Sequence, residues 1–127
     1  MLTAPQAWLK STLLREGRRD LSCGGDPHRL AVLHELEEGI DNHFTVTVPG
    51  ADDRYLVLPF GLHWSEARAS DLIAFDESGK TLEGDGDVEL SAQCIHAPIH
   101  RIAGARVVLH THQTWAVALN MLKDNRL

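Results

Sequence analysis

Turn-forming residues divide the middle of the chain into short segments that favour β-structure. The spacing of these turns constrains the fold more than any other feature. The β-rich run 44–48 ends at Pro49-Gly50, and the β-rich pattern resumes only at 55–58. The runs 72–75 and 81–82 are likewise separated by a segment rich in turn residues. The pattern predicts two antiparallel strand pairs in succession.

Helical periodicity precedes this β-rich region. The segment 4–15 has a partly helical pattern. A second helix is expected to begin at Asp26-Pro27, an N-cap residue followed by proline, and to end at a left-handed cap on Gly39. Its apolar stripe is Leu30, Val32, Leu33 and Leu36. The acidic cluster Glu35, Glu37 and Glu38 is expected to be a solvated helix face.

The helical pattern returns at Ser91, a suitable N-cap residue. The apolar face of this helix is predicted to consist of Ile95, Ile99 and Ile102. Pro98 lies in its interior and is expected to kink it. The run 106–110 then predicts a short apolar strand, and 115–122 an amphipathic helix in which Trp115 is expected to be buried.

Charge and composition argue against several classes of function. The 127 residues carry a formal net charge of −6 and suit one small domain. Such a chain has no basic field to attract nucleic acid or an anionic membrane. No apolar run approaches the roughly 20 residues that cross a bilayer, and no signal peptide is recognisable. We expect a cytoplasmic protein in which Cys23 and Cys94 are reduced, buried thiols.

Two of the eight histidines, His110 and His112, lie at the end of the last predicted strand. Alternate residues of a strand point to the same face, so the two imidazoles are expected to converge if the strand continues through Thr111. Neutral imidazole is a good ligand for Zn²⁺ and similar first-row ions. The pair therefore predicts part of a metal site, although an ordinary pair on a polar face is the more frequent meaning of the motif alone.

Three segments, in order, resemble the class II aldolase/adducin family. The segment Ile95-His-Ala-Pro-Ile-His-Arg101, followed by a short strand and His110-Thr-His112, resembles the family's pattern of helix, strand, His-Thr-His and helix. Glu38-Gly-Ile-Asp-Asn-His-Phe-Thr45 looks like its phosphate-loop region, and Leu58-Pro-Phe-Gly-Leu-His-Trp64 resembles its Pro-Ser-Gly region. The resemblance covers about residues 19–125, so the chain, 1–127, is expected to be a single, partial domain of this family.

The resemblance implies a three-layer α/β/α sandwich with a mainly antiparallel central sheet, whose C-terminal part lies beyond Leu127. It also implies a divalent metal, with Zn²⁺ as the first choice, that polarises the carbonyl of a substrate and stabilises the enediolate formed by carbon–carbon cleavage. His110 and His112 match two of three ligands, and the third belongs to a later strand that this chain does not contain. Homo-oligomers are typical of the family. The substrate-binding residues that it implies are Asn42, His43, Thr45 and Gly61.

Departures from the family pattern bear on the chemistry. Family aldolases carry a proton-transferring Glu four residues before the histidine that His96 matches, and this position is Ala92. The residues that contact a sugar phosphate align with His43, Thr45 and Phe60. These changes favour a metal-dependent, aldolase- or decarboxylase-like enzyme for a small, unphosphorylated carbonyl compound. A non-catalytic, adducin-like assembly module and an inactive fragment remain open.

The remaining histidines have competing interpretations. His96 and His100 lie four apart on a predicted helix, a spacing that suits either a metal or two half-exposed histidines. Half-exposure is favoured for both, more for His100 than for His96, and His96 could instead line the pocket as a catalytic residue in place of the missing carboxylate. His63 is expected to pack with Trp64 at a surface turn.

Overall fold

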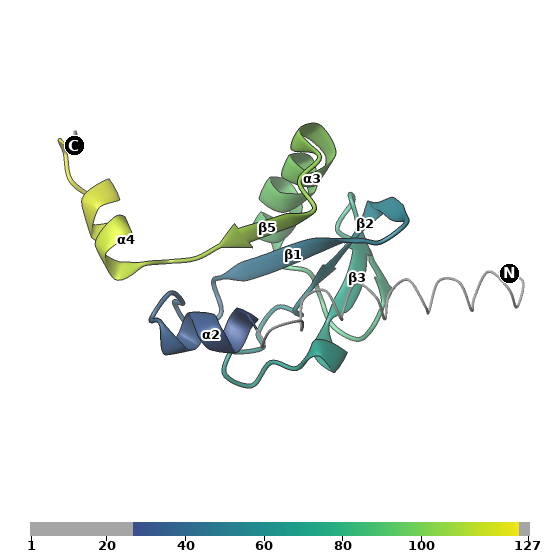
Figure 1. Cartoon of the computed structure of the whole chain (residues 1–127), viewed down its shortest axis with the longest axis horizontal. Coiled ribbons are helices and arrows are strands. Elements are labelled where there is room, and N and C mark those ends of the chain that lie inside the picture. The colour runs from purple at the N-terminus through teal and green to yellow at the C-terminus, as the bar shows by residue number, and fades with distance from the viewer. Residues whose placement is uncertain (1–26, 125–127) are drawn as a thin grey trace, which may run out of the picture.

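A computed structural model describes residues 27–124 as a mixed α/β fold around one sheet (Figure 1). The strands run in the order β4-β3-β2-β1-β5, and every neighbouring pair is antiparallel. They are β1 (His43–Val48), β2 (Ala51–Val57), β3 (Ile73–Asp76), β4 (Thr81–Glu83) and β5 (Val107–His110). The helical elements are α2 (Pro27–Leu33), η1 (Ala69–Asp71), η2 (Ala92–His96), α3 (Ala97–Ala103) and α4 (Thr114–Asn120). Both predicted strand pairs are confirmed.

The first hairpin is tighter than its hydrophobic pattern predicts. Pro49 and Gly50 form a two-residue connection in which Gly50 has φ +73°, a conformation that favours glycine. Val48 therefore pairs directly with Ala51, and β2 begins there instead of at Tyr55. Asp52 and Asp53 are exposed where the β1–β2 ladder is irregular, since Val48 pairs with Ala51 but Thr47 pairs with Tyr55.

The two faces of β1 have different chemistry. Phe44, Val46 and Val48 point to one face, where they join an apolar core that includes Trp64. The alternate residues are the polar set His43, Thr45 and Thr47. They face η2 and α3, whose side chains bond to them. The α3 side of the sheet thus contains a polar layer next to its own apolar cluster, which consists of Tyr55, Val57, Ile73, Phe75 and Ala97.

Helix α2 begins at Pro27 as predicted but ends at Leu33, well before the predicted cap at Gly39. Glu35, at φ +54°, turns the backbone first, and Gly39, at φ +58°, belongs to a later turn. The predicted apolar stripe is confirmed at Val32 and Leu36, which pack against the core, but not at Leu30 and Leu33. His28 and Ala31 are buried, while Leu33 is 75% exposed.

The helix predicted from Ser91 consists of two parts, the π-helical η2 and the α-helical α3. Pro98 is the second residue of α3, so the predicted irregularity takes the form of a π-helical turn before the proline. The predicted apolar face is wrong, since Ile95, Ile99 and Ile102 are exposed. The face that packs on the sheet is instead Ala92, His96, Ala97 and His100.

The last elements leave apolar side chains uncovered within the described residues. Val107 and Leu109 are exposed on β5, which forms one edge of the sheet. Helix α4 lies beyond the end of β5 and away from the sheet (Figure 1). Trp115, predicted to be buried, is 82% exposed there.

Two predictions concern residues outside the described range, namely the helix 4–15 and the state of Cys23. Within 27–124, no helix has the length and apolar character that a membrane span requires.

Candidate metal centre

His110 and His112 converge as predicted. His110 is the last residue of β5, and the extended backbone continues through Thr111, so the two rings lie on the same side. Their Nε2 atoms are 2.8 Å apart and half-buried. Two imidazole nitrogens that bind one ion, each about 2.0–2.1 Å from it, stand roughly 3 Å apart. The two Nε2 atoms share one hydrogen bond, and a separation wider by about half an ångström would let both bind a single tetrahedral ion.

Glu38 holds the ring of His112 in the orientation that metal binding requires. Its Oε2 lies 2.7 Å from Nδ1 of His112 and accepts the proton of that nitrogen. The backbone N–H of His112 also donates to the carbonyl of Leu36 at 3.1 Å. A proton on Nδ1 leaves the lone pair of Nε2 directed at His110. Glu38 thus fixes the orientation of the His112 ring. Its side chain is exposed, as predicted, but it lies beyond the end of α2 and not on a helix face.

The described residues bring together a pair of candidate ligands but not a third. Among residues 27–124, no group of three histidine, cysteine or carboxylate side chains converges in a way that could hold a metal ion.

His43 connects this pair to a buried group of polar side chains. It lies opposite His110 in the β1–β5 ladder, and the two rings stack with centroids 4.7 Å apart. On its other side, His43 Nδ1 is 2.9 Å from Nε2 of His96. His43 is 4% exposed, and His96 has no exposed surface.

A continuous hydrogen-bonded chain runs from Ser91 through this group to Ala105. His43 Nε2 lies 2.7 Å from the hydroxyl of Ser91, and His96 Nδ1 lies 2.7 Å from Thr45 Oγ1. The same Thr45 oxygen is 2.7 Å from Nε2 of His100, whose Nδ1 reaches the carbonyl of Ala105. We call this chain, with the carboxylate beside Ser91, the buried network: Glu89, Ser91, His43, His96, Thr45 and His100.

The half-exposure predicted for His96 and His100 is wrong, because β1 supplies partners that permit their burial.

Burial keeps these histidines neutral. Desolvation, reinforced by the nearby His110, lowers the pKa of His43 from 6.5 to about 4. Desolvation and the neighbouring His43 lower the pKa of His96 to about 3. Burial also lowers the pKa of His100 and of His110. At neutral pH, each ring of the network therefore has one protonated and one unprotonated nitrogen.

Glu89 is a carboxylate next to this group that the sequence did not indicate. Its Oε2 is 3.4 Å from Nε2 of His43 and accepts hydrogen bonds from the Ser91 hydroxyl and the Ala92 N–H. Burial raises the pKa of Glu89, but the bonds from Ser91 and Ala92 outweigh it and hold that pKa below its usual value. The Ala92 side chain is a buried methyl group. A carboxylate is therefore present three residues before the position where the resemblance leads one to expect it.

The other predicted site residues do not join the buried network. The Asn42 side chain accepts the N–H of Glu38 at 2.8 Å and reaches the carbonyl of Gly39, so it shapes the turn that carries Glu38. Gly61 lies in an exposed turn with φ +93°. His63 is on the same surface segment, and its ring bonds to Ser65 at 2.8 Å. Substrate binding by Asn42 and Gly61 stays a prediction.

Two cavities flank the ends of this region. One, of about 310 Å³, adjoins the histidine pair and is lined by Glu37, Glu38, His112, Thr114, Val117, Ala118 and Met121. The second, of about 340 Å³, adjoins the far end of the buried network and is lined by Thr47, Asp52, His100, Arg101, Gly104, Ala105 and Arg106.

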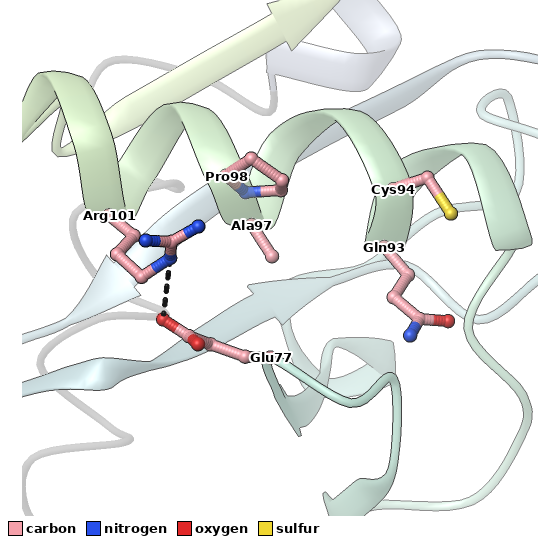
Figure 2. A pocket seen from close by; sticks show the side chains of 6 residues that line it. All are labelled: Glu77, Gln93, Cys94, Ala97, Pro98 and Arg101. Carbon is pink, nitrogen blue, oxygen red and sulfur yellow. Dashed lines mark ion pairs between the residues drawn. The ribbon is translucent and has the colours of Figure 1, made fainter.

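A third cavity, of about 190 Å³, lies between the η2–α3 helix and the turn after β3 (Figure 2). Arg101 pairs with Glu77 across it at 3.5 Å. It contains no histidine, so it is separate from the candidate centre. Cys94 on its rim is exposed, which corrects the predicted burial of this thiol.

Comparison with known proteins gives consistent matches. Residues 27–127 match the family described as "Class II Aldolase and Adducin N-terminal domain". A putative aldolase class 2 protein of Pseudomonas aeruginosa is 34% identical over 102 residues, which cover 79% of this chain and 39% of that protein. The decarboxylase NovR of Streptomyces niveus is 32% identical over 100 residues, covering 73% of this chain and 37% of NovR.

The same relationship is found among solved structures. An aldolase II superfamily protein from Pseudomonas syringae superimposes with a TM-score of 0.76 and 31% identity, covering 98% of this chain and 47% of that one. The chain thus spans less than half the length of each of these three relatives.

Proposed function

Because this chain belongs to the class II aldolase and adducin family, we propose that it contributes the metal-binding half of a lyase of the aldolase or decarboxylase type. The observation that carries the proposal is the convergence of His110 and His112 at 2.8 Å, with Glu38 fixing the protonation of His112. Glu38 sets the tautomer of His112 that metal binding requires, and a metal ion would replace the proton that Nε2 of His110 donates to His112.

In this proposal, Nε2 of His110 and Nε2 of His112 hold a divalent ion, with Zn²⁺ as the first choice. The third ligand comes from outside the described residues. A bound ion would polarise the substrate carbonyl and stabilise the enediolate that bond cleavage leaves. Glu38 keeps His112 in place, and the stacked ring of His43 limits the movement of His110.

The cavity beside His112 supports a small, unphosphorylated carbonyl compound as the substrate. Glu37 and Glu38 line it, and its other described walls come from Thr114, Val117, Ala118 and Met121. No arginine or lysine is among these lining residues, so a phosphate group would meet carboxylates without a compensating cation.

Metal content tests the proposal directly. The wild-type chain, purified without added metal and then titrated with Zn²⁺, is expected to bind one ion. His110→Ala and His112→Ala are each expected to weaken binding by about 100-fold or more, because each removes one of two described ligands. His63→Ala, which removes a histidine outside the buried network, is the matched control and should bind like wild type. Equal binding by all four proteins would exclude this centre.

A second variant tests the orienting role of Glu38. Glu38→Gln removes the charge that fixes the Nδ1 proton of His112, so Zn²⁺ affinity is expected to fall by about 10- to 100-fold. Glu35→Gln is the control, since Glu35 lies in the same acidic cluster but makes no described contact with either ligand. Unchanged affinity in Glu38→Gln would show that the observed bond does not influence the metal.

The alternative is a non-catalytic, adducin-like module, and Ala92 favours it because a methyl group replaces a proton-transferring carboxylate. Screening 2-keto acids and hydroxyaldehydes for cleavage by a full-length form discriminates the two. Metal binding without turnover of either class would support the module.

Self-association and a cytoplasmic location remain part of the proposal. Exposed apolar side chains on β5 and α4, among them Leu109, Trp115 and Met121, suit contact with a second copy or with further parts of the domain.

A further inference from the structure

The residues at the start of β1 lie close to both candidate ligands. Because β1 and β5 are antiparallel, the first residue of β1, His43, stands opposite His110, the last residue of β5. Asn42 precedes the strand, and Thr45 follows His43 on the same face. The family resemblance assigns Asn42, His43 and Thr45 to substrate binding. Their contacts indicate a different role.

These three side chains are buried and already have partners. Asn42 is 6% exposed, and Thr45 has no exposed surface. Oδ1 of Asn42, both ring nitrogens of His43 and Oγ1 of Thr45 each lie 2.7–2.9 Å from a polar atom of another residue. None of the three lines the cavity beside His112. A substrate in that cavity would therefore contact other side chains.

Asn42 acts on His112 through Glu38. Its Oδ1 accepts the backbone N–H of Glu38 at 2.8 Å and so closes the turn 38–42. The Glu38 carboxylate lies 2.7 Å from Nδ1 of His112. Because the Glu38 side chain is itself largely exposed, its direction depends on how this turn holds its backbone. Two successive hydrogen bonds thus connect the buried amide of Asn42 to one ligand.

Thr45 acts on the other ligand, His110, through two buried histidine rings. Its Oγ1 lies 2.7 Å from Nδ1 of His96 and also 2.7 Å from Nε2 of His100. Nε2 of His96 is 2.9 Å from Nδ1 of His43. The ring of His43 stacks on that of His110 with an interplanar angle of 21°. The hydroxyl of Thr45 therefore holds the rings that support the ring of His110.

We propose that Asn42 and Thr45 are positioning residues, one for each ligand of the candidate metal centre. Asn42 holds His112 through Glu38, and Thr45 holds His110 through His96 and His43. The segment 42–45 thereby sets the relative placement of the two Nε2 atoms. This inference rests on the proposed function, because such positioning has a use only if the two histidines bind an ion.

Matched variants separate positioning from substrate binding. Asn42→Ala removes the acceptor of the Glu38 N–H, whereas Asn42→Asp retains it. Thr45→Val keeps the shape of the side chain but removes its hydroxyl, whereas Thr45→Ser retains the hydroxyl. Asn42→Ala and Thr45→Val are each expected to weaken Zn²⁺ binding about tenfold, and the two conservative variants should bind like wild type. Thr81→Val is the control, because the Thr81 hydroxyl donates to Gly86 outside the network.

Combination of each variant with Glu38→Gln tests the route. Since Asn42 acts through Glu38, Asn42→Ala should weaken Zn²⁺ binding by less than about twofold further in the Glu38→Gln protein. Thr45→Val acts on the other ligand, so it should still weaken binding about tenfold there. A general loss of structure in Asn42→Ala would instead lower the affinity equally in both backgrounds. Wild-type affinity of both single variants, or a full tenfold effect of Asn42→Ala on the Glu38→Gln protein, overturns the proposal.

Nuclear magnetic resonance of the metal-free chain, at constant pH, provides a readout that needs no metal. The Glu38 amide is expected to exchange with deuterium at least about tenfold faster in Asn42→Ala than in wild type or Asn42→Asp. The ring signals of His110 should shift in Thr45→Val but not in Thr81→Val. Unchanged exchange together with unchanged ring signals would overturn the positioning. Absence of Zn²⁺ binding by wild type, with both of these changes observed, would overturn the proposed function alone.

Discussion

Lowering the pH from 6.5 to 5 is expected to remove about 3 kcal/mol from the free energy of unfolding. The pKa of His43 is about 4 and that of His96 about 3 in the folded chain, whereas both are near 6.5 when the chain unfolds. Below pH 6.5, the unfolded state therefore binds more protons than the folded state. The stabilisation is complete above pH 6.5 and is lost as the pH falls towards the folded pKa values, by about 1.4 kcal/mol per pH unit for each histidine.

Urea unfolding in a chelator-containing buffer, at intervals between pH 7.5 and 5, measures this loss. His96→Gln removes one of the two most strongly shifted groups, so its stability should fall with pH less steeply than that of wild type. A wild-type unfolding free energy that stays constant from pH 6.5 to 5 would contradict the neutral, buried state of both rings.

Replacing His96 by alanine is expected to destabilise the chain by roughly 3–5 kcal/mol. The side chain is completely buried, so its loss leaves a cavity. The loss also removes the partners of His43 Nδ1 and of Thr45, two buried groups that no water reaches easily. The midpoint of urea unfolding at pH 7.5 gives the measurement.

His63→Ala is the matched control for this substitution. The ring of His63 lies on a surface turn, and its bonds to Ser65 are exposed, so the expected change is within about 0.5 kcal/mol. Equal stability of the His63 and His96 variants would mean that the buried network contributes nothing to folding.

The sheet was predictable because its determinants are local. Pro49-Gly50 and the turn around Gly79 separate the strands, and each turn fixes an antiparallel neighbour within a few residues. The convergence of His110 and His112 was predictable for the same reason, since it follows from the two-residue period of a strand.

The packing of the helices was not predictable because it depends on distant residues. An apolar stripe such as Ile95, Ile99 and Ile102 indicates which side of a helix prefers burial, but not which side the sheet accepts. The polar face of β1 accepted His96 and His100 instead, through hydrogen bonds that span more than 50 residues of sequence. The alternation of His43, Thr45 and Thr47 with Phe44, Val46 and Val48 is the one signal that could have revealed this polar layer.

Glu38 and Glu89 were missed for a related reason. Each is an acidic residue near the start or end of a helix, where solvation is the ordinary expectation. Their roles depend on one specific contact apiece, with His112 and with His43. Single-sequence patterns do not contain such contacts.

The contact between Glu89 and His43 depends on the number of residues in the π-helical turn of η2. A π-turn is equivalent to one residue inserted into an α-helix, so its deletion would rotate the preceding residues by about 100° around the helix axis. Glu89 and Ser91 precede this turn, whereas His100 follows it. A one-residue insertion or deletion here would uncouple Glu89 from His43 with every side chain still present. Relatives of this chain that differ by one residue in this turn should therefore lack an equivalent of the contact between Glu89 and His43, even where their histidines are identical.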